Sequence, residues 1–436
     1  MRRTIFFLII CLSVLLPTAC APIRSTQIES APVLSQTNFL LDTPAITSTS
    51  STSPVPASTV GASQPSPICV SVTEIPYSEC VALVALYRDT GGESWIMNNE
   101  EWVDKDNWLE TATPCSWAGI ACADGHVIEI SLGLNGLTGE IPPEIGDLSH
   151  LTRLDLIDNQ LSRVPAEIGN LTGLMELNLA FNNLSSLPME IGSLTDLTAL
   201  YLAGNELSAI PDMSALADLT VLNLAENNLS EMPQGTANLK NLSALGLASN
   251  NLSNLPAEIG NLTNLINLDL RGNHLENLPP EIGKLTRLTW LDISGNKLSG
   301  LPPEIGDLTN LTELYLENNK LDNLPPEIGA FTKLSWLTAF DNRLDNLPPE
   351  IGYLTALIVL DLQGNNLSDL PPEIGNLADL NILYLSGNNL SGLPPEIAKL
   401  VNLTELGLDD NPLTSLPPEL CAIFQGKVIP GSLCAP

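Results

Sequence analysis

The chain has 436 residues, of which 44% are hydrophobic, 15% charged and only 4% aromatic. So few aromatic residues argue against the varied core of a globular enzyme, whereas a stack of repeats can close its core with one aliphatic residue type. Fifty acidic residues against 17 basic ones give a formal net charge of −33. This balance disfavours nucleic acid as a partner, because phosphates attract basic surfaces, and it is compatible with cationic partners or with solubility alone.

The N-terminus has the layout of an export signal. Met-Arg-Arg precedes the apolar run Ile5–Leu16, which is too short to cross a bilayer as a helix, and small residues follow before Cys20. This context resembles a bacterial lipoprotein signal, in which the cysteine is lipidated, although Leu16 lies four rather than three positions before it. Ordinary cleavage after Ala21 is disfavoured by the proline that would adjoin the scissile bond. We therefore predict a signal peptide at residues 1–19, a lipid anchor on Cys20 as the membrane attachment, and an extracytoplasmic location at the cell surface.

Residues 20–68 form a predicted linker behind the lipidated cysteine. Seventeen of the 25 residues from 43 to 67 are Ser, Thr or Pro, and no hydrophobic periodicity is present. Such a composition cannot bury a core and stays extended, so it would hold the following domain away from a membrane or cell wall.

Residues 69–126 are predicted to form an N-terminal cap, which a repeat array needs to cover its first apolar face. A short helix is expected from 79 to 89, capped by Ser78, with Val81, Val84 and Tyr87 on one side. Trp95, Trp102 and Trp108 follow it, and Trp117 comes after them in the same cap.

The cysteines outside the leader lie in three local pairs beside the ends of the array. Six cysteines allow 15 pairings, and proximity favours the local ones, whereas the spacings do not resemble the C-x₂-C pairs of zinc sites. The predicted disulfides are Cys69–Cys80, Cys115–Cys122 and Cys421–Cys434. Disulfides indicate an oxidising compartment, and the last one would close a C-terminal cap at residues 421–436.

One pattern repeats from residue 127 to residue 420. Asparagine recurs thirteen times at intervals of 22 to 24 residues, each within L-x-x-L-x-L-x-x-N-x-L, as at Leu265, Leu268, Leu270, Asn273 and Leu275. The alternate leucines point inward from a short strand, and the residues between them point outward. The asparagine is expected to be buried and to bond backbone groups in a ladder from coil to coil.

A second segment, L-P-P-E-I-G-x-L, returns along the convex side of each repeat. Proline suits the first position of a helical turn and glutamate suits its positive end, so we interpret the recurrent glutamates as structural. Repeats four and five depart from the motif at residues 211–213, Pro-Asp-Met, and 233–235, Pro-Gln-Gly. These departures indicate locally altered packing on the convex side.

The repeats resemble leucine-rich repeats of the kind found in plant intracellular Ras-group-related proteins and many bacterial proteins. The motif C-x-W-x-G-I-x-C at 115–122, followed by L-T-G-E-I-P-P at 137–143, is similar to the start of plant receptor-kinase ectodomains and polygalacturonase-inhibiting proteins. The resemblance implies an α/β repeat solenoid, a leucine-rich-repeat horseshoe with a parallel concave β-sheet, thirteen repeats of about 23 residues and disulfide-bonded caps. It leaves the ligand open, since the family binds peptides, proteins, hormones and glycans.

The sequence contains no G-x-S-x-G, P-loop or G-x-G-x-x-G motif, so we predict no catalysis, no cofactor and no metal site. We interpret the three histidines, His126, His150 and His274, as lying in unrelated registers without ligand spacing. Residues 104–107, Asp-Lys-Asp-Asn, faintly suggest calcium ligands, and a polar loop in an acidic protein is the simpler interpretation.

Outward positions on the concave sheet lie two, four and six residues before each ladder asparagine. Aromatic and acidic side chains gather at these positions in repeats eight to twelve, a mixture typical of sites that take Lys or Arg through ion pairing and cation–π contact. Packing of the aromatic rings on one another is the alternative explanation. The predicted site consists of Trp290, Asp292, Glu313, Tyr315, Glu317, Trp336, Phe340, Asp361 and Tyr384.

These features predict a cell-surface recognition module that binds a protein or peptide ligand of basic character on its concave sheet. The alternative is a glycan-binding or wall-associated adhesive spacer. Rings arranged for flat stacking on sugars would favour the glycan, whereas rings surrounded by acids would favour a basic peptide.

Overall fold

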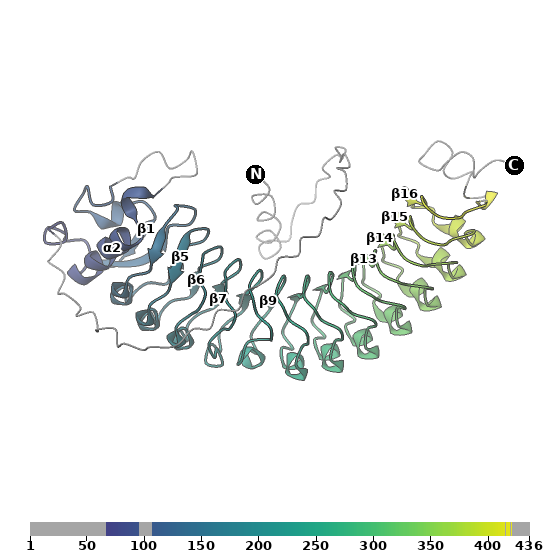
Figure 1. Cartoon of the computed structure of the whole chain (residues 1–436), viewed down its shortest axis with the longest axis horizontal. Helices are drawn as coiled ribbons and strands as arrows, with labels where there is room; N and C mark the ends of the chain where they lie inside the picture. The colour runs from purple at the N-terminus through teal and green to yellow at the C-terminus, as the bar shows by residue number, and fades with distance from the viewer. Residues whose placement is uncertain (1–66, 96–106, 415, 419, 421–436) are drawn as a thin grey trace, which may run out of the picture. The chain divides into compact units, whose positions relative to one another are not determined.

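The computed structural model describes residues 67–95, 107–414, 416–418 and 420 (Figure 1). The described residues all belong to one unit of the chain, residues 63–436. The predicted signal peptide, the Cys20 anchor, nearly all of the linker, Trp102, most of the 104–107 loop and the Cys421–Cys434 pair lie outside the described residues. Of the helices that are described, none combines the length and the apolar character needed to cross a membrane.

The N-terminal cap contains helix α2 (Tyr77–Asp89). The helix starts two residues before the predicted position, with Pro76 as its N-cap residue and no side-chain capping bond, so the predicted cap by Ser78 is wrong. Proline suits a helix start because its φ is fixed and it has no N–H group. The buried residues of α2 are Glu79, Cys80, Ala82, Leu83, Ala85, Leu86 and Tyr87. Val81 and Val84 are half-buried and pack against the core, and Tyr87 on the same side is buried.

Two disulfides and an aromatic cluster hold the cap together. Cys69–Cys80 ties the chain before α2 to the helix, and Cys115–Cys122 ties η2 (Pro114–Ser116) to β1 (Ile120–Ala123), as the sequence predicts. A short 3₁₀ turn, η1 (Gly92–Ser94), follows α2. Ring contacts with centroids 4.9 to 5.9 Å apart connect Tyr87, Trp95, Trp108 and Trp117.

The repeats form a parallel sheet, which confirms the predicted leucine-rich-repeat solenoid. Within the described residues the sheet has 14 strands, with β1 antiparallel to β2 and every later pair parallel. Successive coils stack along a curve, with the strands on its inner side and the 3₁₀ turns on its outer side (Figure 1). A separate two-stranded sheet pairs β3 (Thr138–Glu140) with β5 (Gln160–Arg163). The strands that follow β1 in the large sheet are β2 (His126–Ser131), β4 (Arg153–Asp155), β6 (Glu176–Asn178), β7 (Ala199–Tyr201), β8 (Val221–Asn223), β9 (Ala244–Gly246), β10 (Asn267–Asp269), β11 (Trp290–Asp292), β12 (Glu313–Tyr315), β13 (Trp336–Thr338), β14 (Val359–Asp361), β15 (Ile382–Tyr384) and β16 (Glu405–Gly407).

Leucines fill the core, and the asparagine ladder binds one coil to the next. In the seventh repeat Leu268 and Leu270 are fully buried, and Asn273 is 3% exposed. The side-chain oxygen of Asn273 accepts the backbone N–H of Leu252 at 3.0 Å, and its amide nitrogen donates to the carbonyl of Leu247 at 2.9 Å. Both partners belong to the preceding coil, so the predicted ladder is confirmed.

The convex side consists of 3₁₀ turns, in most of which a proline precedes or begins the turn and a glutamate lies in its first residues. The five-residue turns are η3 (Pro143–Asp147), η4 (Ala166–Asn170), η5 (Met189–Ser193), η7 (Ala257–Asn261), η8 (Pro280–Lys284), η9 (Pro303–Asp307), η10 (Pro326–Ala330), η11 (Pro349–Tyr353), η12 (Pro372–Asn376) and η13 (Pro395–Lys399). The glycine of each E-I-G lies where the next coil approaches: a Cβ at Gly283 would be 2.4 Å from the carbonyl oxygen of Glu304. Where repeats four and five lose the motif, no 3₁₀ turn lies between β7 and β8, and η6 (Thr236–Asn238) has only three residues.

Candidate ligand-binding surface on the concave sheet

Five neighbouring strands, β11 to β15, carry the predicted site. Because these strands pair without offset, outward residues line up in columns across the sheet. In one column Glu313 pairs with Trp290 on one side and with Trp336 on the other. At about 4.8 Å per strand, the Cα atoms of the two tryptophans are about 10 Å apart. The neighbouring column consists of Asp292, Tyr315, Thr338, Asp361 and Tyr384.

The two tryptophans have different surroundings. Trp290 packs on Tyr315, with ring centroids 5.8 Å apart and planes at 52°. The Tyr315 hydroxyl donates to Glu313 Oε2 at 2.7 Å, and burial together with this bond raises the pKa of Tyr315, so the hydroxyl remains a donor at neutral pH. Trp336 is 39% exposed. Packing of one ring on another therefore explains why an aromatic residue is present at position 290. It does not explain the exposed ring of Trp336.

Asp292 points to the concave side in register but is only 5% exposed. Its Oδ1 accepts the backbone N–H and the hydroxyl of Ser294 at 2.9 and 2.6 Å, and its Oδ2 lies 3.9 Å from an Arg271 guanidinium nitrogen. These neighbours lie against the carboxylate and shield it from water. Of the predicted acids, Asp292 is thus the one placed below the surface.

The remaining predicted acids bond to neutral groups. Glu317 accepts the Thr338 hydroxyl, and Asp361 accepts the backbone and side-chain N–H groups of Gln363 at 3.1 Å. Among the described residues, neither these two carboxylates nor that of Glu313 lies within 4 Å of a Lys or Arg nitrogen. This part of the sheet therefore keeps an excess of negative charge.

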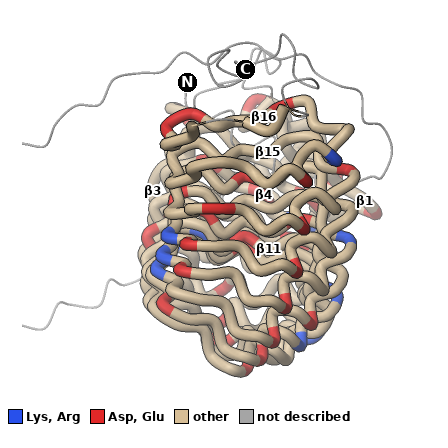
Figure 2. Tube along the Cα trace, turned by 90° about the vertical axis from the view of Figure 1, so that its right-hand side faces the viewer, with Lys and Arg blue, Asp and Glu red and all other residues tan. Residues whose placement is uncertain are grey.

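Asp269 and Arg271 extend the cluster by one strand and were missed in the sequence. Asp269 pairs in register with Asp292, and Arg271 lies 3.4 Å from Asp269 and 3.9 Å from Asp292. Burial raises the pKa of Asp269 to about 6 although the guanidinium opposes the shift. Burial also raises the pKa of Asp292, Glu317 and Asp361. Both residues occupy outward positions of repeat seven, a repeat with no aromatic residue at these positions. Acidic positions also recur on successive coils of the whole solenoid (Figure 2).

Tyr384 and Phe340 complete the predicted set at its C-terminal side. The Tyr384 hydroxyl donates to Glu405 Oε2 at 2.5 Å, and this bond raises the pKa of Tyr384 to about 12. Phe340 and Tyr384 are both half-buried. Neither ring is as accessible as that of Trp336.

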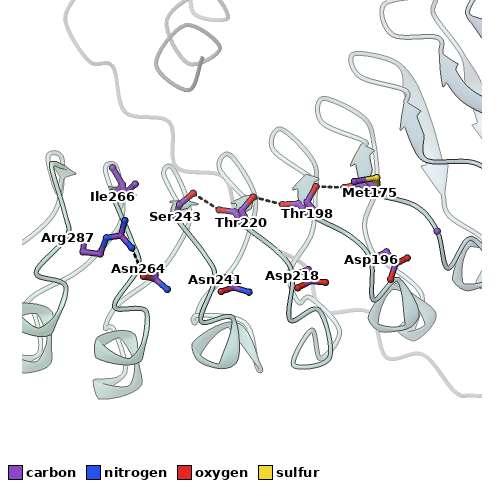
Figure 3. Close-up of a pocket in the computed structure, with 11 residues that line it drawn as sticks. Met175, Asp196, Thr198, Asp218, Thr220, Asn241, Ser243, Asn264, Ile266 and Arg287 are labelled. Carbon is purple, nitrogen blue, oxygen red and sulfur yellow. Dashed lines mark hydrogen bonds between the residues drawn. The ribbon is translucent and has the colours of Figure 1, made fainter. Parts of the chain in front are cut away.

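A groove runs along the edge of the large sheet at which the chain enters the strands of repeats three to eight (Figure 3). This groove has a volume of about 680 Å³ and no aromatic residue in its lining. Thr198, Thr220 and Ser243 each donate a hydroxyl to a carbonyl of the preceding coil at 2.9 to 3.0 Å. Arg287 donates to Asn264 at 2.7 Å. The sequence did not predict this groove, because the residues that line it differ in type from coil to coil. They share only their position, beside the leucine that precedes each strand, and this position could have indicated the groove.

His126 and His150 share a register, so for this pair the prediction of unrelated registers is wrong, whereas His274 lies in a different register, directly after Asn273. His126 and His150 are 24 residues apart, the same interval that separates ladder asparagines 135 and 159, and they occupy equivalent positions in the first two coils. Their rings stack with centroids 3.6 Å apart and planes at 19°. Glu79 of α2 lies 2.6 Å from His126 Nδ1. The register was countable in the sequence, but the contact with Glu79 depends on how the cap folds back.

Parallel strands in register, buried asparagines and convex 3₁₀ turns define a leucine-rich-repeat solenoid. The leucine-rich repeat region family matches residues 131–232, 201–314 and 281–362, and the leucine rich repeat family matches residues 355–413. The chain belongs to the leucine-rich-repeat proteins.

Individual relatives match parts of the chain. Receptor-like protein 3 of Arabidopsis thaliana is 36% identical over 99 residues, which cover 21% of this chain and 12% of that protein. A solved leucine-rich-repeat protein of Leptospira interrogans is 40% identical, covers 67% of this chain and 75% of its own, and has a TM-score of 0.64. The plant peptide hormone receptor RGFR1, solved in complex with RGF2, is 31% identical, with 70% and 62% covered and a TM-score of 0.53. The chain spans only a small part of the curated relatives, 12% in the case of Receptor-like protein 3.

Proposed function

We propose that the protein is an extracytoplasmic recognition module that binds a peptide or protein segment rich in Lys or Arg on its concave sheet and catalyses no reaction. The observation that carries this proposal is the exposed ring of Trp336 beside Glu313, a carboxylate with no Lys or Arg neighbour among the described residues. A large aromatic ring in contact with water is typical of binding hot spots, and an adjacent carboxylate favours a cationic side chain.

In this mode a Lys or Arg side chain of the ligand lies between Trp290 and Trp336 and pairs with Glu313, their common register partner. The ring faces attract the cation through their quadrupoles, and the carboxylate bonds its N–H groups. Asp292 is buried and acts through its electric field rather than by contact. Because several acids share the surface, the rate of association should fall as salt is added.

The comparisons support a peptide as the class of ligand. RGFR1 is a plant peptide hormone receptor solved with RGF2 bound, and its fold is similar to that of this chain. Two disulfides in the cap and the similarity to receptor-like proteins support a place outside the cytoplasm. The lipid anchor on Cys20 belongs to the same proposal. A glycan-binding or wall-associated adhesive role is the second candidate, since the Trp336 ring also offers a face for stacking on sugars.

The test is to probe the purified protein against a synthetic peptide array of basic, neutral and acidic sequences and against a glycan array. Basic peptides should bind, and Trp290→Ala and Trp336→Ala should each weaken that binding by more than about 1 kcal/mol with little change in thermal unfolding. Tyr353→Ala is the matched control, because this aromatic side chain is 62% exposed but lies in η11 on the convex side.

Substitution of the carboxylate distinguishes the two candidates. Glu313→Gln should weaken the basic peptides and reduce the dependence of their affinity on salt. Unchanged affinity in both tryptophan variants would place the site elsewhere on the solenoid. Glycan binding that depends on Trp336, in the absence of peptide binding, would favour the adhesive role.

A further inference from the structure

Three side chains of complementary chemistry meet where the cap joins the first two coils. Glu79 comes from α2, His126 begins β2, and His150 lies in the turn before β4. One ligand atom from each of the three lies within 4.8 Å of the other two, and no other trio of His, Cys, Asp or Glu in the described part of the chain does so. The cluster is remote from β11 to β15 along the array, so the proposed peptide site does not account for it.

Glu79 is built into the cap as a buried carboxylate with both oxygens engaged. It is 2% exposed; Oε1 lies 2.6 Å from His126 Nδ1, and Oε2 accepts the backbone N–H of Val127 at 2.8 Å. With the Nδ1 proton directed at the carboxylate, the lone pair of the His126 ring is on Nε2. A carboxylate that fixes a histidine through its second nitrogen is the arrangement that orients imidazoles toward metal ions.

His150 supplies the second imidazole from the next coil. It is exposed, and its ring lies on that of His126 at 3.6 Å between centroids. Two imidazole nitrogens that share a tetrahedral ion at 2.0 to 2.1 Å are roughly 3.4 Å apart. The His150 side chain is exposed, and its Nδ1 lies 3.3 Å from the Ser149 hydroxyl. A change of its side-chain torsions can bring a nitrogen next to Nε2 of His126.

We infer that His126 and His150 bind a divalent transition-metal ion of the zinc type, with Glu79 as the positioning residue that sets the tautomer of His126. Imidazole nitrogens suit Zn²⁺, Cu²⁺ and Ni²⁺, whereas Ca²⁺ and Mg²⁺ prefer oxygen ligands. The ion joins the first coil to the second, and through Glu79 it joins both to the cap helix. Water or a ligand atom from a partner completes the coordination on the solvent side.

Calorimetric titration of the full, tag-free, oxidised chain with ZnCl₂ tests the site. The wild type should bind one Zn²⁺ per chain and unfold at a higher temperature when Zn²⁺ is present, and CaCl₂ should do neither. His150→Ala should abolish binding. His274→Ala is the matched control, because His274 is also exposed but belongs to the seventh coil, and it should bind Zn²⁺ as the wild type does.

Glu79→Gln tests the positioning role. The glutamine amide can donate to His126 Nδ1 and so move the ring proton to Nε2, which should weaken Zn²⁺ binding by roughly 10–100-fold. If this buried substitution prevents folding, proton NMR of the wild type answers the same question: Zn²⁺ should shift the ring signals of His126 and His150 and leave those of His274 in place. Equal Zn²⁺ affinity of the wild type and His150→Ala, or no binding by the wild type, would overturn the inference.

Discussion

Replacing Asp269 by asparagine should stabilise the solenoid at neutral pH. Burial raises the pKa of Asp269 from 3.8 to about 6, against the opposing charge of Arg271. A shift of about two units corresponds to about 3 kcal/mol at about 1.36 kcal/mol per unit. Asparagine removes the buried charge and can still accept the Arg271 backbone N–H, which Asp269 Oδ1 accepts at 3.2 Å.

The pH dependence has a definite sign. Because the folded protein holds this proton more tightly than the unfolded chain does, Asp269 contributes stability that is fully present below pH 3.8 and is lost as the pH rises through about 6. Burial raises the pKa of Asp292, Glu317 and Asp361 in the same direction, so each of them also favours the folded state at acidic pH.

Guanidinium unfolding followed by circular dichroism from pH 4 to pH 8 measures the effect. The free energy of unfolding of Asp269→Asn should exceed that of the wild type by about 3 kcal/mol at pH 7 to 8, and the difference should shrink through pH 6 and be small at pH 4. A variant that is no more stable than the wild type at pH 7 would refute the reasoning, because the ion pair with Arg271 would then outweigh burial. A difference that does not change with pH would refute it as well.

Three further changes test other parts of the chain. Gly283→Ala should lower the free energy of unfolding by about 1–3 kcal/mol, because the added methyl group meets a carbonyl oxygen of the next coil; denaturant melts should show Gly300→Ala, which has open space around it, to be tolerated. Peptide mapping without reduction should recover a peptide that joins Cys421 to Cys434, and a free thiol at either position would contradict the C-terminal cap. Cys20→Ala should move the protein from the membrane fraction to the soluble one without changing its thermal unfolding. Equal amounts of the wild type and the variant in the membrane fraction would contradict the prediction of a lipid anchor.

The solenoid could be predicted because its rules are local and repeated. The burial of Leu268 and the ladder bonds of Asn273 follow from their positions within one repeat, and the same positions recur in every coil. Pairing without offset then placed Trp290, Glu313 and Trp336 side by side. The start of α2 was harder, because Pro76 and Ser78 both suit a helix N-terminus and only the packing of the cap decides between them.

The parts of the site that escaped prediction depend on side chains from different coils or from the cap. Asp292 is outward by register, yet Ser294 and Arg271 shield it, and a pattern of inward and outward positions does not contain that information. The contact of Glu79 with His126 spans 47 residues and requires the fold of the cap. Periodicity predicts which face a residue is on, but not which neighbours cover it.

The loss of the 3₁₀ turn between β7 and β8 has a mechanical consequence. In an array where each coil contacts only its neighbours, stiffness is transmitted from one interface to the next. Between β7 and β8 the asparagine ladder continues, because the Leu207 N–H donates to the side chain of Asn227 at 3.0 Å. The stack of 3₁₀ turns on the convex side is interrupted there. Bending of the solenoid should therefore concentrate here, as at a hinge. The cap with its histidine pair and the acidic aromatic surface of β11 to β15 lie on opposite sides of this hinge, so flexing would change the separation of the two without disturbing the interior of either.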